Sequence, residues 1–409
     1  MPIQQERLVK RLEALGQIGA TVEGGVTRLA YTPEYRQAEA RVRGWMEEAG
    51  LETRLDPVGN LIGRREGRQA DRPCLMLASH IDSVINGGRF DGALGVLSAV
   101  EVAQALYEDG ATLDMPLEVV AFIDEEGSRW GGGLFGSRAM TGQLTPESLQ
   151  RRDRAQLSVA EALRAWGLDP TQLNQAVREA AEIGTYLELH IEQGAVLESE
   201  GLAVGVVTAI AGPLFLEARL HGRADHAGAT PMGPLRRDAL LGAAELALAA
   251  EVIARATSPT CVATVGRLEV SPGVANIIPG EVLLTFDIRD IDQAARDRAE
   301  ARIRAEIERV CQARALTAQV ETVVRIEPVK LSPTVIEAVS TACARLDLPV
   351  YHLPSGAGHD AQLMTGLAEV GMIFVRCREG ISHSPAESVT PEDAFLGAQV
   401  MYEATLYMR

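Results

Sequence analysis

The chain places acidic residues and histidines in short motifs, several of which directly follow apolar runs. Ser79-His80-Ile81-Asp82 follows the apolar residues 75–78, and Asp124-Glu125-Glu126 ends the run that begins at residue 117. A carboxylate two residues after a histidine can orient the imidazole ring. Three consecutive acids at the end of a buried strand are costly unless cations neutralise them. Adjacent carboxylates also suit a division of work in which one binds a metal ion and its neighbour moves protons.

Three further motifs contribute the same residue types. The segment Asn86-Gly87-Gly88-Arg89-Phe90-Asp91-Gly92 surrounds one aspartate with glycines, which suits a tight turn. The segment Glu188-Leu189-His190-Ile191-Glu192 alternates in the manner of a strand, so its three ligand-type side chains share one face. His383 lies in a loop that precedes a proline. Taken singly, each motif has an ordinary structural explanation, such as an aspartate at position 91 that caps a helix.

Taken together, the motifs provide a mixed set of nitrogen and oxygen ligands without thiolates. The set consists of His80, Asp91, Glu126, His190 and His383. It suits Zn²⁺, Mn²⁺, Co²⁺ or Ni²⁺ and argues against a structural, cysteine-rich zinc site. Five ligands exceed what one tetrahedral ion takes, whereas two ions that share a carboxylate would use all of them. The sequence therefore predicts two divalent metal ions per subunit.

The elements that must position these residues have the pattern of an α/β fold. Short apolar runs occur at residues 75–78, 117–123, 186–191 and 372–375, and helical patterns at 93–107 and 334–346 separate some of them. This alternation is typical of a mostly parallel sheet flanked by helices. Ligands of such sheets gather beyond the carboxyl ends of the strands, which is where the polar motifs are expected to lie.

A different pattern occupies residues 211–327. It contains strand patterns at 214–220, 261–270, 282–289 and 317–325, and helical patterns at 235–256 and 293–314. This order predicts a small α+β domain with two helices on one face of a sheet. The chain then returns to helix and strand alternation. We therefore expect an inserted domain at 211–327 within a catalytic domain formed by residues 1–210 and 328–409.

Composition narrows the classes of partner. The 409-residue chain has a formal net charge of −17, which disfavours nucleic acid and anionic membrane surfaces as partners. An acidic protein that binds an anionic small molecule needs a local cation in its cleft. The five cysteines are widely spaced, no signal-peptide pattern begins the chain, and no apolar run reaches the ~18 residues of a membrane span. We expect a cytoplasmic protein.

Seven ordered motifs give the chain a strong resemblance to a known family. It resembles the dinuclear metallohydrolases of the aminoacylase and carboxypeptidase (M20) type, and specifically their hydantoinase/carbamoylase branch. The matching segments are residues 79–84, 86–92, 124–127, 188–194, 225–232, 355–361 and 382–387. Peptidases of the wider family generally place a carboxylate at the position of His190, so the resemblance favours carbamoyl chemistry over peptide cleavage.

The resemblance implies a role for each residue of the ligand set. Asp91 would bridge the two ions, and Glu125 would act as the general base. Asp82, which can orient His80, is placed with Glu125 among the catalytic residues. The remaining ligands would divide between the ions, with His80 and His190 on one and Glu126 and His383 on the other.

The resemblance also assigns residues of the inserted domain, which it makes a lid and dimerisation domain. Arg289 would bind the substrate carboxylate and supply the cation that the acidic composition requires. His226, a catalytic residue, and Asn276 would bind the reacting carbonyl from the partner subunit of a homodimer. Gln193 and Gly358 would be further substrate contacts.

Each of these residues also has an ordinary explanation without the resemblance. His226 could be a loop residue and Asn276 a turn former. Arg289 could form a surface ion pair with Asp287 or Asp290. The three remaining histidines are interpreted as structural: His221, His352 and His359.

The implied reaction is hydrolysis of the carbamoyl group of an N-carbamoyl-L-amino acid to the free amino acid, ammonia and carbon dioxide. Segments 79–96 and 136–140 look closest to the branch members that act on such substrates. Allantoate and N-carbamoyl-β-alanine are the rival substrates within the branch. A non-catalytic protein that binds a carboxylate ligand is the rival of another class, but the complete ligand set and Glu125 argue against it.

Overall fold

The computed structural model describes residues 2–408 and contains two compact units. Unit 1 is formed by Met1–Thr208, Leu331–Ser355 and His359–Arg409, and unit 2 by Ala209–Lys330 and Gly356–Gly358. Each unit has its own hydrophobic core.

Unit 1 is built around a nine-stranded sheet. The strand order is β1-β2-β4-β3-β5-β15-β6-β13, and β14 also pairs with β6. The strands are β1 (Glu52–Leu55), β2 (Leu61–Arg65), β3 (Cys74–His80), β4 (Leu117–Phe122), β5 (Ile183–Ile191), β6 (Val204–Ile210), β13 (Val329–Lys330), β14 (His352–Ser355) and β15 (Glu369–Val375). The four central strands, β4, β3, β5 and β15, are parallel, whereas the flanking pairs are antiparallel. The predicted α/β fold with a mostly parallel sheet is therefore confirmed.

The central strands are buried because helices cover them. Every residue of β3 and β4 is buried, as expected for parallel strands packed on both faces. The longer helices are α1 (Gln5–Gly16), α2 (Pro33–Glu48), α3 (Ala93–Glu108), α10 (Pro333–Arg345) and α12 (Pro391–Tyr407). The shorter ones are α4 (Phe135–Met140), α5 (Pro146–Gln150), α6 (Val159–Trp166), α7 (Val196–Ser199) and α11 (Asp360–Met364), with the 3-10 turns η1 (Pro170–Ala176) and η2 (Arg378–Gly380). Helix α3 is buried along most of its length because it packs against β3 and β5 as well as α1, α2 and α12.

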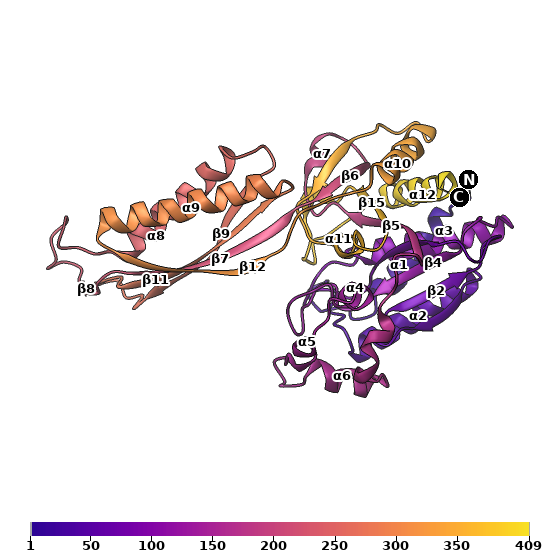
Figure 1. Cartoon of the computed structure of the whole chain (residues 1–409), viewed down its shortest axis with the longest axis horizontal. Coiled ribbons are helices and arrows are strands. Elements are labelled where there is room, and N and C mark those ends of the chain that lie inside the picture. The colour runs from indigo at the N-terminus through magenta and orange to yellow at the C-terminus, as the bar shows by residue number, and fades with distance from the viewer. Residues whose placement is uncertain (1, 409) are drawn as a thin grey trace. The chain divides into compact units, whose positions relative to one another are not determined.

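Unit 2 is an α+β unit with an antiparallel sheet of order β12-β7-β11-β9. The strands are β7 (Gly212–His221), β9 (Val262–Ser271), β11 (Glu281–Asp290) and β12 (Thr317–Arg325). Helices α8 (Ala239–Arg255) and α9 (Gln293–Arg314) cover one face of this sheet (Figure 1). Burial alternates along β7 and β11, so one face of each strand packs on the helices. A two-stranded ribbon of β8 (Asp225–His226) and β10 (Ile277–Ile278) completes the unit.

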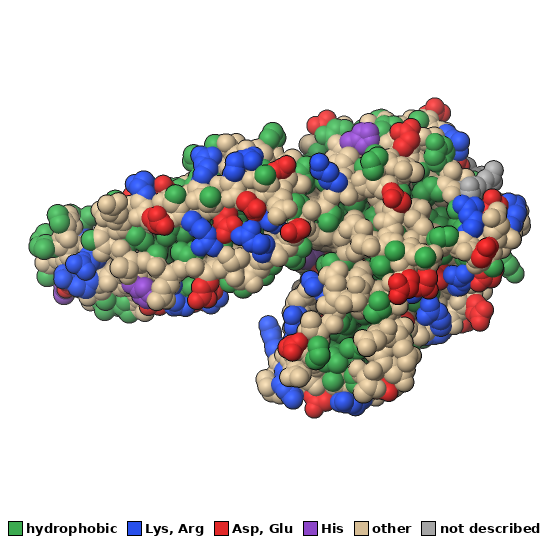
Figure 2. All heavy atoms as spheres, in the orientation of Figure 1, with side chains coloured by type: hydrophobic (Ala, Val, Ile, Leu, Met, Phe, Trp, Pro, Cys, Tyr) green, Lys and Arg blue, Asp and Glu red, His purple; other side chains and the backbone are tan. Residues whose placement is uncertain are grey.

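The two helices of unit 2 differ in the side chains that they expose. The outer face of α9 mixes acidic and basic residues (Figure 2), which pair with each other as in Arg304–Glu300 at 2.9 Å and Arg309–Glu306 at 2.7 Å. Helix α8 instead exposes Leu248 at 71% and Val252 at 66%. A solvated ion-pair face is typical of a helix in contact with water, whereas neighbouring exposed apolar side chains are typical of an interface.

Two further observations concern the whole described chain. All five cysteines are buried and free. Among residues 2–408, no helix combines the length and the apolar composition that a membrane crossing requires.

Candidate active site

The four parallel strands of unit 1 bring the predicted ligands to one edge of the sheet. His80 is the last residue of β3, and Asp124-Glu125-Glu126 follows the end of β4. His190 is the penultimate residue of β5, and the loop that carries His383 follows β15 and η2. Because these strands are parallel, their carboxyl ends lie together, as expected for the site of an α/β fold.

Asp91 lies at the centre of the ligand set. Its Oδ1 atom lies 3.0 Å from Nε2 of His190 and 3.7 Å from Nε2 of His80. Its Oδ2 atom lies 3.2 Å from Nε2 of His383, which in turn lies 3.4 Å from Oε2 of Glu126. The five residues thus form two groups that share Asp91, and within each group the ligand atoms lie within 4.8 Å of one another.

The carboxylate of Asp91 is not used to cap a helix. The N-cap of α3 is Gly92, whose φ is 62°, and no side chain caps this end. A Cβ atom at Gly92 would lie 2.4 Å from atoms of the His80 ring. The glycine therefore leaves room for the imidazole as well as allowing a left-handed backbone. The ordinary explanation of Asp91 as a helix cap is not observed.

Asp82 connects the His80 loop to the acidic loop. Its two carboxylate oxygens accept the backbone amides of Glu125, at 3.2 Å, and Glu126, at 3.1 Å. Nδ1 of His80 lies 3.2 Å from the backbone carbonyl oxygen of Asp82 and 3.6 Å from its carboxylate. Asp82 therefore lies beside the imidazole of His80, where the sequence placed it. It also holds the backbone of the acidic pair, which the sequence did not predict.

The site concentrates negative charge in a buried environment. Burial raises the pKa of Glu125 well above its usual range. It raises the pKa of Glu126 to about 7 and that of Asp124 to about 8. Neighbouring acids contribute to the raised pKa of all three groups. Burial acts in the opposite direction on His80, but the carboxylates around it, Glu125 first, raise its pKa well above the usual value. Burial opposes ionisation of Asp91 as well, yet the three histidine rings beside it, His190 first, hold its pKa well below the usual range. Such a cluster favours bound cations.

The donor atoms of the set fit divalent metal ions. Nδ1 of His190 lies 2.9 Å from the Ile191 carbonyl oxygen, so in the neutral ring Nδ1 carries the hydrogen and the lone pair of Nε2, which lies 3.0 Å from Asp91, is left for a metal ion. His80 is arranged in the same way, with its Nδ1 on a backbone carbonyl. Nε2 of His190 and Oε1 of Glu126 are buried without a hydrogen-bond partner. Buried polar atoms are rarely left unpaired, and imidazoles held at one nitrogen commonly bind metal through the other.

A buried network beside His190 was not singled out from the sequence. The rings of His359 and His190 lie 4.5 Å apart, and together with Glu188 they form a third group of potential ligands. Glu188 already accepts hydrogen bonds from the Ser79 and Tyr186 hydroxyls and from the amide of Ala361. Burial lowers the pKa of His359 well below its usual value, so this ring is neutral. The interpretation of His359 as structural missed its contact with His190; its presence in the motif 355–361 was the available signal.

Gln193, predicted to contact substrate, lies on the ligand set itself. Its Nε2 atom donates to Oδ2 of Asp91 at 2.9 Å and lies 3.5 Å from Nε2 of His383. Its φ of 55° is uncommon for a residue with a side chain and marks local strain, which is frequent at functional sites.

Unit 2 brings His226 and Asn276 together. Ile277 pairs with His226 in the two-stranded ribbon, and the amide of Ala227 donates to the Asn276 carbonyl oxygen at 3.0 Å. Both predicted residues are exposed. Nδ1 of His226 accepts the amides of Gly228 and Ala229, so the neutral ring carries its hydrogen on Nε2 and can donate it.

Arg289 is held by two partners within unit 2. Its Nε and Nη2 atoms bond to the carboxylate of Asp287 at 2.9 and 2.8 Å, and Nη1 donates to the Gly356 carbonyl oxygen at 2.8 Å. The ion pair that the sequence offered as an ordinary explanation is therefore present. Gly358 belongs to the short segment 356–358 that is part of unit 2.

The strand register separates Arg289 from His226. On β11, Glu281 pairs with His221 at one end, and Arg289 pairs with Pro213 near the other. Eight residues of extended strand span ~26 Å. His226 lies in the ribbon that follows His221, beyond the first of these ends (Figure 1). Within one copy of unit 2, the two residues are thus at opposite ends of the sheet.

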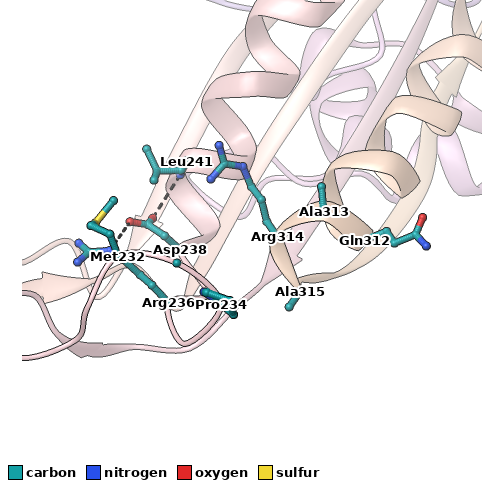
Figure 3. Close-up of a pocket in the computed structure, with 10 residues that line it drawn as sticks. Met232, Pro234, Arg236, Asp238, Leu241, Gln312, Ala313, Arg314 and Ala315 are labelled. Carbon is teal, nitrogen blue, oxygen red and sulfur yellow. Dashed lines mark hydrogen bonds and ion pairs between the residues drawn. The ribbon is translucent and has the colours of Figure 1, made fainter.

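A cavity of about 450 Å³ lies elsewhere in unit 2 (Figure 3). It is formed by the start of α8, the loop that precedes α8 and the end of α9. Its lining includes Arg236, Asp238 and Arg314. Its lining contains neither a histidine nor any of the predicted site residues.

Comparison with known proteins places the chain in a family. The model of peptidase family M20/M25/M40 matches residues 76–407. The chain belongs to this family. An N-carbamoyl-L-amino acid amidohydrolase of Geobacillus stearothermophilus is 48% identical over 98% of this chain and 97% of the relative. A crystal structure of an amidase of the hydantoinase/carbamoylase family from Burkholderia multivorans superposes with a TM-score of 0.92 at 37% identity, covering 99% and 98% of the two chains.

Another relative is named for a different activity. An allantoate deiminase of Arabidopsis thaliana is 37% identical over 96% of this chain and 80% of the relative. The shared chemistry of these relatives identifies the present chain as a hydrolase that acts on amides, and its resemblance to the hydantoinase/carbamoylase branch is confirmed.

Proposed function

We propose that this M20 member hydrolyses the carbamoyl group of N-carbamoyl-L-amino acids, giving the free amino acid, ammonia and carbon dioxide. The observation that carries the proposal is the Asp91-centred cluster of nitrogen and oxygen donors, found in a chain that is 48% identical to an amidohydrolase of this substrate class.

Two divalent ions would be held by the two groups that share Asp91. His80 and His190 would hold one, and Glu126 and His383 the other. When bound, such ions supply positive charge that polarises a carbonyl oxygen and lowers the pKa of water. Zn²⁺, Mn²⁺, Co²⁺ and Ni²⁺ all accept this donor set.

Glu125 would be the general base. It neighbours Glu126 in the chain, and its Oε2 atom lies 3.7 Å from Nε2 of His80 at the edge of the cluster. Asp82 accepts the backbone amide of Glu125 and so fixes the backbone from which the carboxylate extends. A buried carboxyl group whose pKa is raised can take a proton from the attacking water and return it to the leaving nitrogen.

Arg289 would bind the substrate carboxylate. Asp287 binds the edge formed by Nε and Nη2 and the Gly356 carbonyl binds Nη1, so the plane of the guanidinium is fixed. A planar guanidinium so fixed can still donate from its remaining N–H groups to a carboxylate. Gly358 belongs to the segment that contacts Arg289 and would contribute a backbone contact, and Gln193 would contact the substrate from the ligand set.

In a homodimer, His226 and Asn276 of one subunit would act on the carbonyl group of the substrate that is bound to the other subunit. The Nε2–H of His226 can donate to the oxygen on which negative charge develops. The separation of ~26 Å along β11 supports this arrangement, because one small substrate cannot reach both Arg289 and His226 of the same copy.

The surface of unit 2 supports a homodimer. Helix α8 exposes Leu241, Leu248 and Val252 along one face, and β9 exposes Val262 and Leu268. Strand β9 is an edge of the four-stranded sheet, so its backbone groups are open to pairing with a second copy. We therefore assign dimerisation to α8 and β9.

A reducing, cytoplasmic location is part of the proposal. Its support is the presence of five buried free cysteines, which is typical of proteins from a reducing compartment.

Allantoate hydrolysis is the second candidate, because an allantoate deiminase is 37% identical across 96% of the chain. The metal-reconstituted protein should be assayed for ammonia release from N-carbamoyl-L-amino acids, their D enantiomers, N-carbamoyl-β-alanine and allantoate. The proposal expects the highest kcat/KM for an L-amino acid derivative, with ammonia and amino acid formed in equal amounts. A higher kcat/KM for allantoate would contradict the proposal and support allantoate hydrolysis instead.

A further inference from the structure

Glu387 plays no part in the steps above, yet it connects two loops that carry predicted metal ligands. Its buried carboxylate accepts two consecutive backbone amides through Oε1: that of Phe90 at 2.8 Å and that of Asp91 at 3.1 Å. Its Oε2 atom lies 3.3 Å from the hydroxyl of Ser382. Residues nearly 300 positions apart in the chain are joined by this one side chain.

Ser382 extends the connection to the side chain of Asp91. Its hydroxyl lies 2.8 Å from Oδ2 of Asp91, the oxygen that also faces His383. Ser382 directly precedes His383 in the chain. The backbone of Asp91, its carboxylate and the loop of His383 are therefore all fixed with reference to Glu387.

Gly88 provides the space that Glu387 occupies. A Cβ atom at this position would lie 1.9 to 2.1 Å from the carboxyl atoms of Glu387. The backbone of Gly88 is not in the left-handed region, so its conformation does not demand glycine. What demands glycine is the room for the carboxylate. Gly88 and Glu387, which belong to two separate sequence motifs, thus fit each other as a pair.

The arrangement repeats that of Asp82. There too, one buried carboxylate accepts the amides of two consecutive residues, Glu125 and Glu126. Each of these two ligand-bearing loops is therefore held by a carboxylate from another segment. Side chains that orient ligands in this way generally influence metal affinity strongly.

We propose that Glu387 is a positioning residue that locks the Asp91 loop to the His383 loop and so maintains the ion held by Asp91, Glu126 and His383. The proposal rests on the proposed two-metal function. Replacing Glu387 by alanine removes the acceptor of two amides and the neighbour of Ser382. The His383 side chain is 49% exposed and should lose its position first.

A glutamine at this position separates positioning from other roles. In Glu387→Gln, Oε1 can still accept both amides, and the new Nε2 group can donate to the Ser382 oxygen, which leaves the serine hydrogen for Asp91. A role as metal ligand or proton carrier would be lost in this variant. A positioning role would be retained.

The test combines metal binding with hydrogen exchange. Zn²⁺ titration against a competing chelator should show two ions in the wild type and in Glu387→Gln, and an affinity for one ion about 10- to 100-fold weaker in Glu387→Ala. In the metal-free proteins, the segments 86–92 and 380–388 should exchange faster in Glu387→Ala than in Glu387→Gln. Asp153→Ala is the matched control, because Asp153 is a buried carboxylate that accepts the amides of Ala155 and Leu157. It should leave both readouts unchanged.

Gly88→Ala supplies a second route to the same result. It should weaken the same ion and speed exchange of the same segments, because the added methyl group displaces the carboxylate. Combined with Glu387→Ala, it should add little, since the group with which it collides is gone. Fully additive effects, an equal loss in Glu387→Gln, or unchanged binding and exchange in Glu387→Ala would each overturn the proposal. A wild type that binds no Zn²⁺ would contradict the two-metal function, while exchange in the metal-free proteins would still decide the loop lock.

Discussion

The predicted chemistry in unit 1 and the predicted recognition in unit 2 rest on opposite kinds of structure. The Asp91 cluster is mostly buried and held by several loops, with Asp82 and Glu387 each accepting two backbone amides. His226 and Asn276 are exposed at one end of unit 2, and Arg289 is held at the other end.

This difference separates what each unit can complete alone. Unit 1 contains every residue that the proposed metal site needs, in two groups that share Asp91 and whose ligand atoms lie within 4.8 Å of one another. Unit 2 presents two recognition features that one substrate cannot contact together in the same copy. Metal binding should therefore be a property of each subunit, whereas turnover should require the dimer.

The largest effect is expected for Asp91→Ala. Because Asp91 belongs to both ligand groups, its loss should remove both ions and reduce turnover toward the uncatalysed rate. Metal analysis of the purified variant checks this prediction. Retention of two ions would show that Asp91 does not bridge them.

Glu125→Gln should keep both ions and lose turnover by roughly 10²- to 10⁴-fold, the usual contribution of a general base. The amide preserves the size of the side chain, and the backbone hydrogen bond to Asp82 does not depend on it. Metal content and kcat should be measured on the same preparation. An emptied site, or wild-type turnover, would show that the roles of Glu125 and Glu126 are assigned wrongly.

Arg289→Lys should lower kcat/KM about 10- to 100-fold, the effect of losing one charged hydrogen bond. The ammonium group cannot reproduce the two-pronged geometry of the guanidinium. Replacing the carbamoyl amino acid by its decarboxylated carbamoyl amine should abolish the difference from wild type. Arg219→Lys, which alters another ion-paired arginine of the same sheet, is the control and should change little. A gap that persists with the amine would rule out carboxylate binding by Arg289.

Leu248→Ala should produce the smallest effect, a roughly tenfold weaker dimer, because it removes part of one exposed apolar side chain from the proposed interface. Sedimentation at several concentrations measures the dissociation constant. Val22→Ala is the control, since Val22 is 99% exposed in unit 1. An unchanged dissociation constant would exclude α8 from the interface.

The sequence predicted the elements better than it predicted how their loops are held. The strands and helices around His80, Asp124 and His190 are recognisable because their apolar runs are local, and the parallel sheet follows from helix and strand alternation. Asp82 was expected to orient His80, but its hydrogen bonds to the acidic loop depend on segments more than 40 residues apart. The contact of His359 with His190 and the fit of Glu387 to Gly88 arise only after the sheet has formed, so no local pattern announces them.

The most direct test of the division between the two units is complementation between two inactive variants. Glu125→Gln and His226→Ala homodimers should both be nearly inactive, because each lacks the same group at both sites. A mixed dimer has one site with both defects and one site with neither. If subunits exchange at random, about half of the dimers are mixed, so roughly a quarter of wild-type activity should return. With exchange verified by differently tagged chains, failure to recover activity would contradict a site completed by unit 2 of the partner subunit.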